Sequence, residues 1–225
     1  MKNINIFSDS LKYLKNSLNT KKRIYESYLP LAIKEEELFE NYLNPLETFH
    51  SNRIEGNNYT LDETRCLIDT GYVPKGKSVK DTLEIENLSK TLKYVNSYNR
   101  ELTEDFIKDV HRGITNATLD EYEDSGNYKR IRNWVGNITT SAPEHVPIHM
   151  KKLIDWYNCN KDKMDSIELA TMFKYKFLCI HPFVDGNGRV SRLLFNYIIT
   201  KNNYVNCIIF EEDRADYYKA LQNSK

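Results

Sequence analysis

The chain has 225 residues, enough for one domain with a sizeable hydrophobic core. Lysine plus arginine and aspartate plus glutamate number 32 each, so the formal net charge at pH 7 is zero. A general nucleic-acid binder or an anionic-membrane binder would carry a basic excess. We therefore expect no nucleic acid and no membrane among the partners, and any recognition of phosphate has to be local.

The sequence shows neither a clear targeting segment nor a cysteine pattern typical of disulfides or metal sites. No apolar run approaches 18 residues, and the first 15 residues lack the apolar core of a signal peptide. The four cysteines lie far apart without CxxC spacing, which argues against zinc and disulfides and favours buried free thiols. We expect a cytoplasmic protein, of bacterial origin.

Helical periodicity dominates the first part of the chain. Residues 1–43 are expected to form an N-terminal helical segment that packs on the core, with Pro30 kinking or dividing it. A further helix is expected at about 44–56. Pro45 suits its first turn, and Gly56 suits its C-terminal end.

Three more helices follow in chain order. Thr60 and Glu63 form a capping-box pattern that opens a short helix closed by Gly71. Amphipathic segments then run from about 79 to 98 and from about 103 to 115. The sequence contains no internal repeat, low-complexity tract or flexible linker, so we expect a single, mainly helical domain.

The pattern changes between 125 and 147, where glycine and proline alternate with β-branched and aromatic residues. This composition predicts a short β-hairpin at about 134–147. Helices are expected again at 148–159 and after Asp165, where the sequence is apolar nearly all round and therefore central. Residues 201–225 predict one short strand and one helix, too little for an added DNA-binding domain.

The stretch "HPFVDGNGRVSR" concentrates polar groups at the start of a predicted helix. Gly186, Asn187 and Gly188 lie at its N-terminus, where unpaired N–H groups and the helix dipole favour anions. Arg189 and Arg192 are three residues apart and are expected to remain free for bidentate contacts to phosphate oxygens.

Two further groups suggest chemistry on a nucleotide polyphosphate. Asp185 supplies a carboxylate of the kind that Mg²⁺ bridging phosphates prefers. His181 is the nearby group able to accept a proton near neutral pH. A glycine turn between two helices is usually only a turn, but all of these groups together favour transfer of a phosphate-containing group.

The stretch matches the pattern HPFx[DE]GNGRxxR of Fic-domain proteins at every fixed position, and the resemblance covers about 44–200. It implies a mainly α Fic fold, a helical bundle with a β-hairpin flap beside the active-site loop. Most characterised members transfer AMP from ATP to a hydroxyl of a target protein. By this resemblance His181 would be the general base, and Asp185 would hold Mg²⁺ with ATP as the co-substrate.

The resemblance also assigns the remaining residues of the loop. Gly186, Asn187 and Gly188 would form the anion hole for the nucleotide phosphates, and Arg189 and Arg192 would contact the distal phosphates. The family's phosphate-transferring branch departs from the GNGR pattern. This chain keeps Gly188, which favours AMP transfer.

A second motif, "SNRIEGN", resembles the inhibitory pattern [ST]xxxE[GN] of many Fic proteins. Ser51, Glu55 and Gly56 occupy its defining positions, and its place before the core resembles the class with an N-terminal inhibitory helix. If this helix packs beside the active loop, Glu55 can pair with Arg192 and put a negative charge where phosphate must lie. The expected protein is therefore an autoinhibited protein adenylyltransferase.

Partners and alternatives follow from the same resemblance. In the family, the hairpin flap docks a target protein by β-augmentation. Self-modification or a homo-oligomer could involve some of the 16 tyrosines. The alternatives are an enzyme that removes AMP or uses another nucleotide, and a nucleotide-binding regulatory module with negligible turnover. The intact His181 argues against a dead enzyme.

Overall fold

The computed structural model describes residues 9–135 and 138–223. The chain is mainly helical, and its elements in order are α1 (Asp9–Glu26), α2 (Ile33–Ile54), α3 (Leu61–Thr70), α4 (Val79–Ser97), α5 (Glu104–Thr115), β1 (Trp134–Val135), β2 (Ile138–Thr139), α6 (Val146–Asn160), α7 (Ser166–Ile180), α8 (Asn187–Thr200) and α9 (Arg214–Asn223). Short 3₁₀ turns occupy Tyr122–Asp124, Pro143–His145 and Glu211–Asp213.

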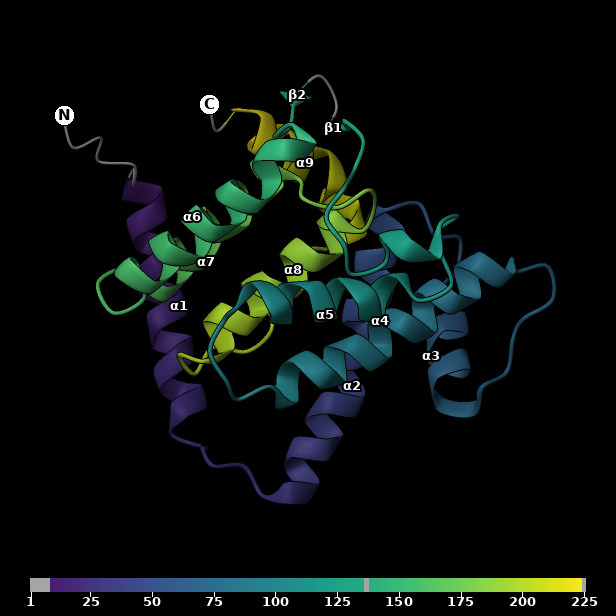
Figure 1. Cartoon of the computed structure of the whole chain (residues 1–225). Coiled ribbons are helices and arrows are strands. Elements are labelled where there is room, and N and C mark those ends of the chain that lie inside the picture. The colour runs from purple at the N-terminus through teal and green to yellow at the C-terminus, as the bar shows by residue number, and fades with distance from the viewer. Residues whose placement is uncertain (1–8, 136–137, 224–225) are drawn as a thin grey trace.

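Helix α8 lies at the centre of the bundle (Figure 1), in contact with α7, α5, α4 and α2. Its expected apolar face is confirmed, because the five side chains on it are all buried: Val190, Leu193, Leu194, Tyr197 and Ile198. They pack against aromatic side chains of α5 and α7, including Phe106, Phe173 and Phe177. Burial of this core fixes the N-terminal end of α8, where the motif residues lie.

Local capping determines several helix ends as expected. The Thr60 hydroxyl accepts a hydrogen bond from the Glu63 amide, and the Glu63 carboxylate accepts one from the Thr60 amide at 2.8 Å. Gly71 closes the helix in the left-handed region with φ 73°. Asp165 caps α7 by accepting from the backbone N–H of Glu168.

Helix α2 differs from the expectation, because Pro45 lies inside it rather than in a first turn. The boundary expected between residues 43 and 44 therefore falls within one continuous helix, while Pro30 does divide α1 from α2. The first half of α2 is largely exposed, whereas most side chains from Asn44 to Ile54 are buried. Packing of this second half holds the helix through a residue that cannot donate a backbone hydrogen bond.

The strand expected after residue 200 does not form among the described residues. Residues 204–210 form no regular secondary structure, and at Cys207 a side chain takes the backbone hydrogen bonds that a neighbouring strand would make. The Asn196 side chain accepts from the N–H of Cys207 and donates to its carbonyl oxygen. Asn206 donates to Glu47 on α2. The segment is therefore fastened to α8 and α2, and the helix expected beyond it is α9.

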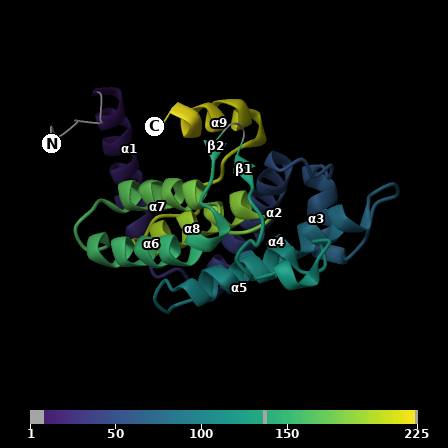
Figure 2. The same ribbon diagram turned by 45° about the horizontal axis from the view of Figure 1, so that its top comes forward.

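The hairpin region holds two short antiparallel strands, with Trp134 opposite Thr139. They lie near α9 in both views (Figure 2). The pairing is shorter than the expected 134–147, since a 3₁₀ turn begins at Pro143 and α6 begins at Val146. Residues 136 and 137 of the expected hairpin lie outside the described residues.

None of the helices within 9–135 and 138–223 combines the length and the hydrophobicity needed to cross a bilayer. All four cysteines are free thiols, as expected. The expectation that they are buried is wrong. Cys159, Cys179 and Cys207 are exposed and Cys66 is half-buried, because they lie on solvent-facing sides of their segments.

Candidate active site

The loop between α7 and α8 places a histidine in an unusual backbone conformation. His181 ends α7 with φ 52° and ψ 61°, in the left-handed region that non-glycine residues seldom adopt. Its Nδ1 is buried without a hydrogen-bond partner in the part of the chain that the structure describes. Such strain is commonly found at functional sites.

The environment of His181 keeps its imidazole neutral. Burial, and next the nearby ammonium of Lys129, lower its pKa to about 4, although Asp185 and Glu55 act in the opposite direction. A neutral imidazole is the form that accepts a proton at physiological pH. The predicted base therefore has the protonation state that its role requires.

The start of α8 is shaped to receive an anion. Gly186 is the N-cap residue with φ 75°, and an added Cβ there would lie 3.1 Å from the Ile114 side chain. Asn187 uses its side-chain amide inside the loop, accepting from Phe183 N at 3.0 Å and donating to Phe183 O at 2.8 Å. Because the Asn187 side chain is occupied in this way, the donors that can face an anion are the backbone N–H groups of Asn187 and Gly188.

A carboxylate from α2 occupies this position. A Cβ added at Gly188 would clash with Glu55 Oε1, so the carboxylate lies directly against the first turn of α8. The same oxygen lies 2.7 Å from Arg192 Nη2. Ser51 completes the contact, because its hydroxyl accepts from Arg192 Nε at 2.8 Å and its carbonyl accepts from Nη2 at 2.9 Å. The structure thus brings Ser51 and Glu55 to Arg192 as the two motifs predict, while Gly56 ends α2 with φ 100°.

Both arginines were expected to reach a ligand. Arg192 is instead held in the predicted pair with Glu55, and for Arg189 the expectation of a free side chain is wrong. Arg192 is 7% exposed and bound by α2, and Arg189 is 2% exposed. Arg189 Nη1 lies 3.1 Å from Glu84 Oε1 on α4, and Nη2 lies 3.5 Å from Asp185 Oδ2. Its Nε and Nη1 are both buried without a hydrogen-bond acceptor among the described residues, although Nη1 is ion-paired with Glu84, so Nε is the donor left without any partner there.

Asp185 is the residue of the site best placed for a metal ion. Its side chain is 53% exposed, and Oδ1 accepts from the Gly186 amide. No group of three or more His, Cys, Asp or Glu side chains at metal-binding spacing occurs among residues 9–135 and 138–223. This donor set suits Mg²⁺, which usually keeps several waters and binds one or two carboxylates together with substrate phosphates.

Sequence reasoning missed the residues behind the loop. The buried ring of His111 on α5 stacks on Phe183, with centroids 3.8 Å apart. Its Nε2 donates to Asp185 O at 3.0 Å, because Nδ1 already accepts from the Gly126 amide. A polar residue on an apolar helix face, beside Val110, was the available signal.

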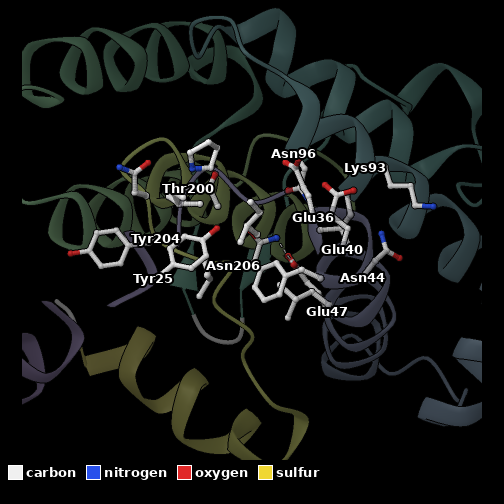
Figure 3. A pocket seen from close by; sticks show the side chains of 18 residues that line it. Tyr25, Glu36, Glu40, Asn44, Glu47, Lys93, Asn96, Thr200, Tyr204 and Asn206 are labelled. Atoms are coloured by element: carbon white, nitrogen blue, oxygen red, sulfur yellow. Dashed lines mark hydrogen bonds between the residues drawn. The ribbon is translucent and has the colours of Figure 1, made fainter. Parts of the chain in front are cut away.

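Glu47 lies on α2 one helical turn before Ser51, on the side of Ser51 away from Glu55. Glu47, Ser51 and Glu55 are four residues apart and therefore share one face of the helix. Glu47 is buried, and its two carboxylate oxygens accept from Asn196 and Asn206 at 2.7 and 2.8 Å. Burial raises its pKa to about 7. The side chain also lines a cavity of about 320 Å³ between α1, α2 and the segment after α8 (Figure 3).

The predicted site residues do not line that cavity. They instead converge on the N-terminal end of α8. There the arrangement offers a neutral base, an anion-binding helix terminus, two arginines and an exposed carboxylate. This set can bind a polyphosphate and remove a proton from an attacking group, provided that the Glu55 carboxylate moves away.

Known proteins resemble this chain in sequence and in fold. The model of the Fic/DOC family matches residues 101–199. The crystal structure of a Fic domain containing signaling protein from Bacteroides thetaiotaomicron aligns with a TM-score of 0.82 and 30% identity, covering 92% of this chain and 80% of that chain.

Curated relatives are also similar. Protein adenylyltransferase Fic of Nematostella vectensis is 36% identical over 182 residues, which cover 78% of this chain and 42% of the relative. Protein adenylyltransferase fic-1 of Caenorhabditis briggsae is 34% identical over 182 residues, which cover 78% of this chain and 36% of the relative. The chain thus spans 36–42% of the length of these relatives.

Proposed function

Because this chain belongs to the Fic/DOC family, we propose that it is a protein adenylyltransferase held inactive by its own Glu55. It transfers AMP from ATP to a Ser, Thr or Tyr hydroxyl of a target protein. The names of the curated relatives support this activity. The observation that carries the proposal is the Glu55 carboxylate, which lies against Gly188 and 2.7 Å from Arg192.

His181 acts as the general base. Its neutral imidazole takes the proton of the target hydroxyl, and the hydroxyl oxygen attacks the α-phosphorus of ATP. The bond from the α-phosphorus to the bridging oxygen then breaks, and pyrophosphate leaves with the negative charge. The backbone N–H groups at Asn187 and Gly188 stabilise the charge that develops on the phosphate oxygens.

The two arginines hold the distal phosphates. Arg189 has a buried Nε without an acceptor among the described residues, which a phosphate oxygen can satisfy. Arg192 becomes available when Glu55 leaves it. Until then the carboxylate both occupies the guanidinium and repels phosphate, so bound ATP is misplaced for in-line attack.

Asp185 would hold Mg²⁺, and its exposed carboxylate fits that ion. When bound, Mg²⁺ neutralises phosphate charge and orients the polyphosphate. The hydrogen bond that the Gly186 amide donates to Asp185, together with the ion pair between Arg189 and Asp185, keeps the carboxylate at the mouth of the loop.

The target protein docks along the β1–β2 hairpin as an added strand. The exposed Trp134 supports this role, because its indole is 63% exposed at the start of β1 and can cover an apolar side chain of the target. A cytoplasmic location, a bacterial origin, self-modification and a homo-oligomer remain predictions.

Removal of AMP is the second candidate function. The position of the Glu55 carboxylate favours it, since a carboxylate at the anion site can also orient a water molecule toward an AMP-modified hydroxyl. Use of another nucleotide and a role as a binding module are further alternatives.

Labelled ATP distinguishes these functions. Wild type, Glu55→Gly and Glu55→Gly/His181→Ala are incubated with Mg²⁺ and bacterial lysate, and with ATP labelled on the α- or the γ-phosphate. Protein label from the α-phosphate alone, lost with His181, is the expected result. Label from the γ-phosphate would instead show phosphate transfer. Absence of label in all three variants would favour AMP removal, another nucleotide or a binding module.

A further inference from the structure

Lys129 is a buried lysine whose ammonium, among the described residues, donates its hydrogen bonds to neutral oxygens. The residue lies between α5 and β1 in the sequence and is 2% exposed, although lysine is almost never fully buried without partners. The ammonium donates to Asn133 Oδ1, to Thr140 Oγ1 at 2.7 Å and to Ile180 O at 3.5 Å. Its three protons therefore have three acceptors, which accounts for its tolerance of burial.

These acceptors belong to two different parts of the site. Asn133 precedes β1 and Thr140 follows β2, so the ammonium holds both ends of the hairpin together. The Thr140 hydroxyl also donates to the Asn133 carbonyl oxygen at 2.8 Å. Ile180, by contrast, is the residue directly before the base His181. One side chain thus links the hairpin to the catalytic loop.

Two further hydrogen bonds make the same connection. The backbone N–H of Lys129 donates to Pro182 O at 2.8 Å, and Asn133 Nδ2 donates to Phe183 O at 2.8 Å. Carbonyl oxygens on both sides of His181 are therefore bound by the base of the hairpin. We call Lys129, Asn133 and Thr140 the hairpin anchor.

Such a connection matters because His181 and the hairpin have to act on the same hydroxyl. A general base works within about 3 Å of the proton that it removes. A misplacement of about 1 Å can cost about 100-fold in rate. The strained backbone of His181 cannot keep its position without support from its surroundings.

We propose that Lys129 is a positioning residue, which through Asn133 and Thr140 sets the placement of the hairpin, and so of a docked target strand, relative to His181. This inference rests on the proposed transferase function. Lys129 itself contacts neither the anion site at α8 nor the Glu55–Arg192 pair. Its loss therefore affects transfer to a hydroxyl and spares the binding of ATP.

A matched set of variants tests the hairpin anchor in the Glu55→Gly background. Lys129→Met keeps an unbranched side chain one atom shorter than lysine and removes all three hydrogen bonds. Thr140→Val removes one hydroxyl at nearly constant volume, and Thr140→Ser keeps that hydroxyl. The measurements are the rate of α-phosphate label transfer in bacterial lysate, the Kd of Mg-ATP, and hydrogen exchange in residues 180–185.

We expect kcat for label transfer to fall about 10- to 100-fold in Lys129→Met and less in Thr140→Val. The Kd of Mg-ATP should change less than about twofold, and exchange in residues 180–185 should rise in both variants. Thr140→Ser should keep both the transfer rate and the hydrogen-exchange protection of the parent variant. A purely structural role would lower the melting temperature and weaken ATP binding together with transfer.

The outcomes separate this inference from the proposed function. If the parent variant transfers no label, the proposed function fails, and hydrogen exchange still decides whether the anchor holds the loop. Equal labelling by the parent and Lys129→Met would overturn the inference, as would unchanged exchange in residues 180–185. If Lys129→Met does not fold, the pair Thr140→Val and Thr140→Ser provides the same test.

Discussion

Glu47 makes the stability of the fold depend on pH in a way that can be calculated. Its carboxyl group is buried, and burial raises its pKa from an ordinary value of 4.5 to about 7. The protonated form is therefore favoured by the folded state. The stabilising contribution is complete below pH 4.5 and is lost as the pH rises through about 7. At about 1.4 kcal/mol per pKa unit, this amounts to about 3 kcal/mol.

The variant Glu47→Gln isolates this effect. Its amide oxygen can still accept from Asn196, and its NH₂ group can donate to Asn206 after that side-chain amide turns over. We expect the free energy of unfolding of wild type, relative to Glu47→Gln, to fall by about 3 kcal/mol between pH 4.5 and pH 8. For a chain of this size the difference in melting temperature should change by about 6–12 °C.

Thermal unfolding monitored by circular dichroism at several pH values measures this difference. The control is Glu40→Gln, which changes an exposed acid on the same helix at the same cavity. Its melting curve should follow that of wild type throughout. Parallel pH profiles for wild type and Glu47→Gln would refute the reasoning.

Three further substitutions test individual contacts. Ser51→Ala removes the acceptor of Arg192 Nε, so ATP-dependent self-labelling or lysate labelling should rise, though less than in Glu55→Gly; labelling below wild type would contradict this. Gly188→Ala places a methyl group where the Glu55 carboxylate lies, so it should displace Glu55 without activating the enzyme, and calorimetry should show weaker Mg-ATP binding. His111→Phe keeps an aromatic ring and loses two hydrogen bonds. Denaturant unfolding should report a free energy of unfolding lower by about 2–4 kcal/mol. An unchanged free energy of unfolding would show that these hydrogen bonds are unimportant.

Features set by neighbouring residues could be predicted from the sequence. The caps at Thr60 and Asp165 depend on groups only three residues away, and Gly71 ends its helix by its own backbone freedom. The anion-binding loop could also be predicted, because its glycines and its histidine lie within one short stretch of sequence. The pairing of Glu55 with Arg192 was predicted from two specific motifs rather than from spacing alone.

Features set by distant partners could not be predicted in this way. Pro45 looked like a helix start, yet packing of the residues after it keeps α2 continuous. The apolar run near Cys207 looked like a strand, yet the Asn196 side chain takes the hydrogen bonds that a second strand would need. Arg189 was expected to be free because Glu84 is 105 residues away in the chain and only the fold brings the two together. Tertiary contacts override local preference at each of these places.

The Glu55 contact is the central claim, and the rate of α-phosphate label transfer in Glu55→Gly tests it most directly. The matched control is Glu40→Gly, the same change at an exposed position on the same helix. If the carboxylate blocks the anion site with an interaction worth at least about 1.4 kcal/mol, removing it should raise transfer at least about tenfold. Glu40→Gly should remain at the wild-type rate. Equal transfer by wild type and Glu55→Gly, under matched Mg²⁺ and ATP, would contradict the account.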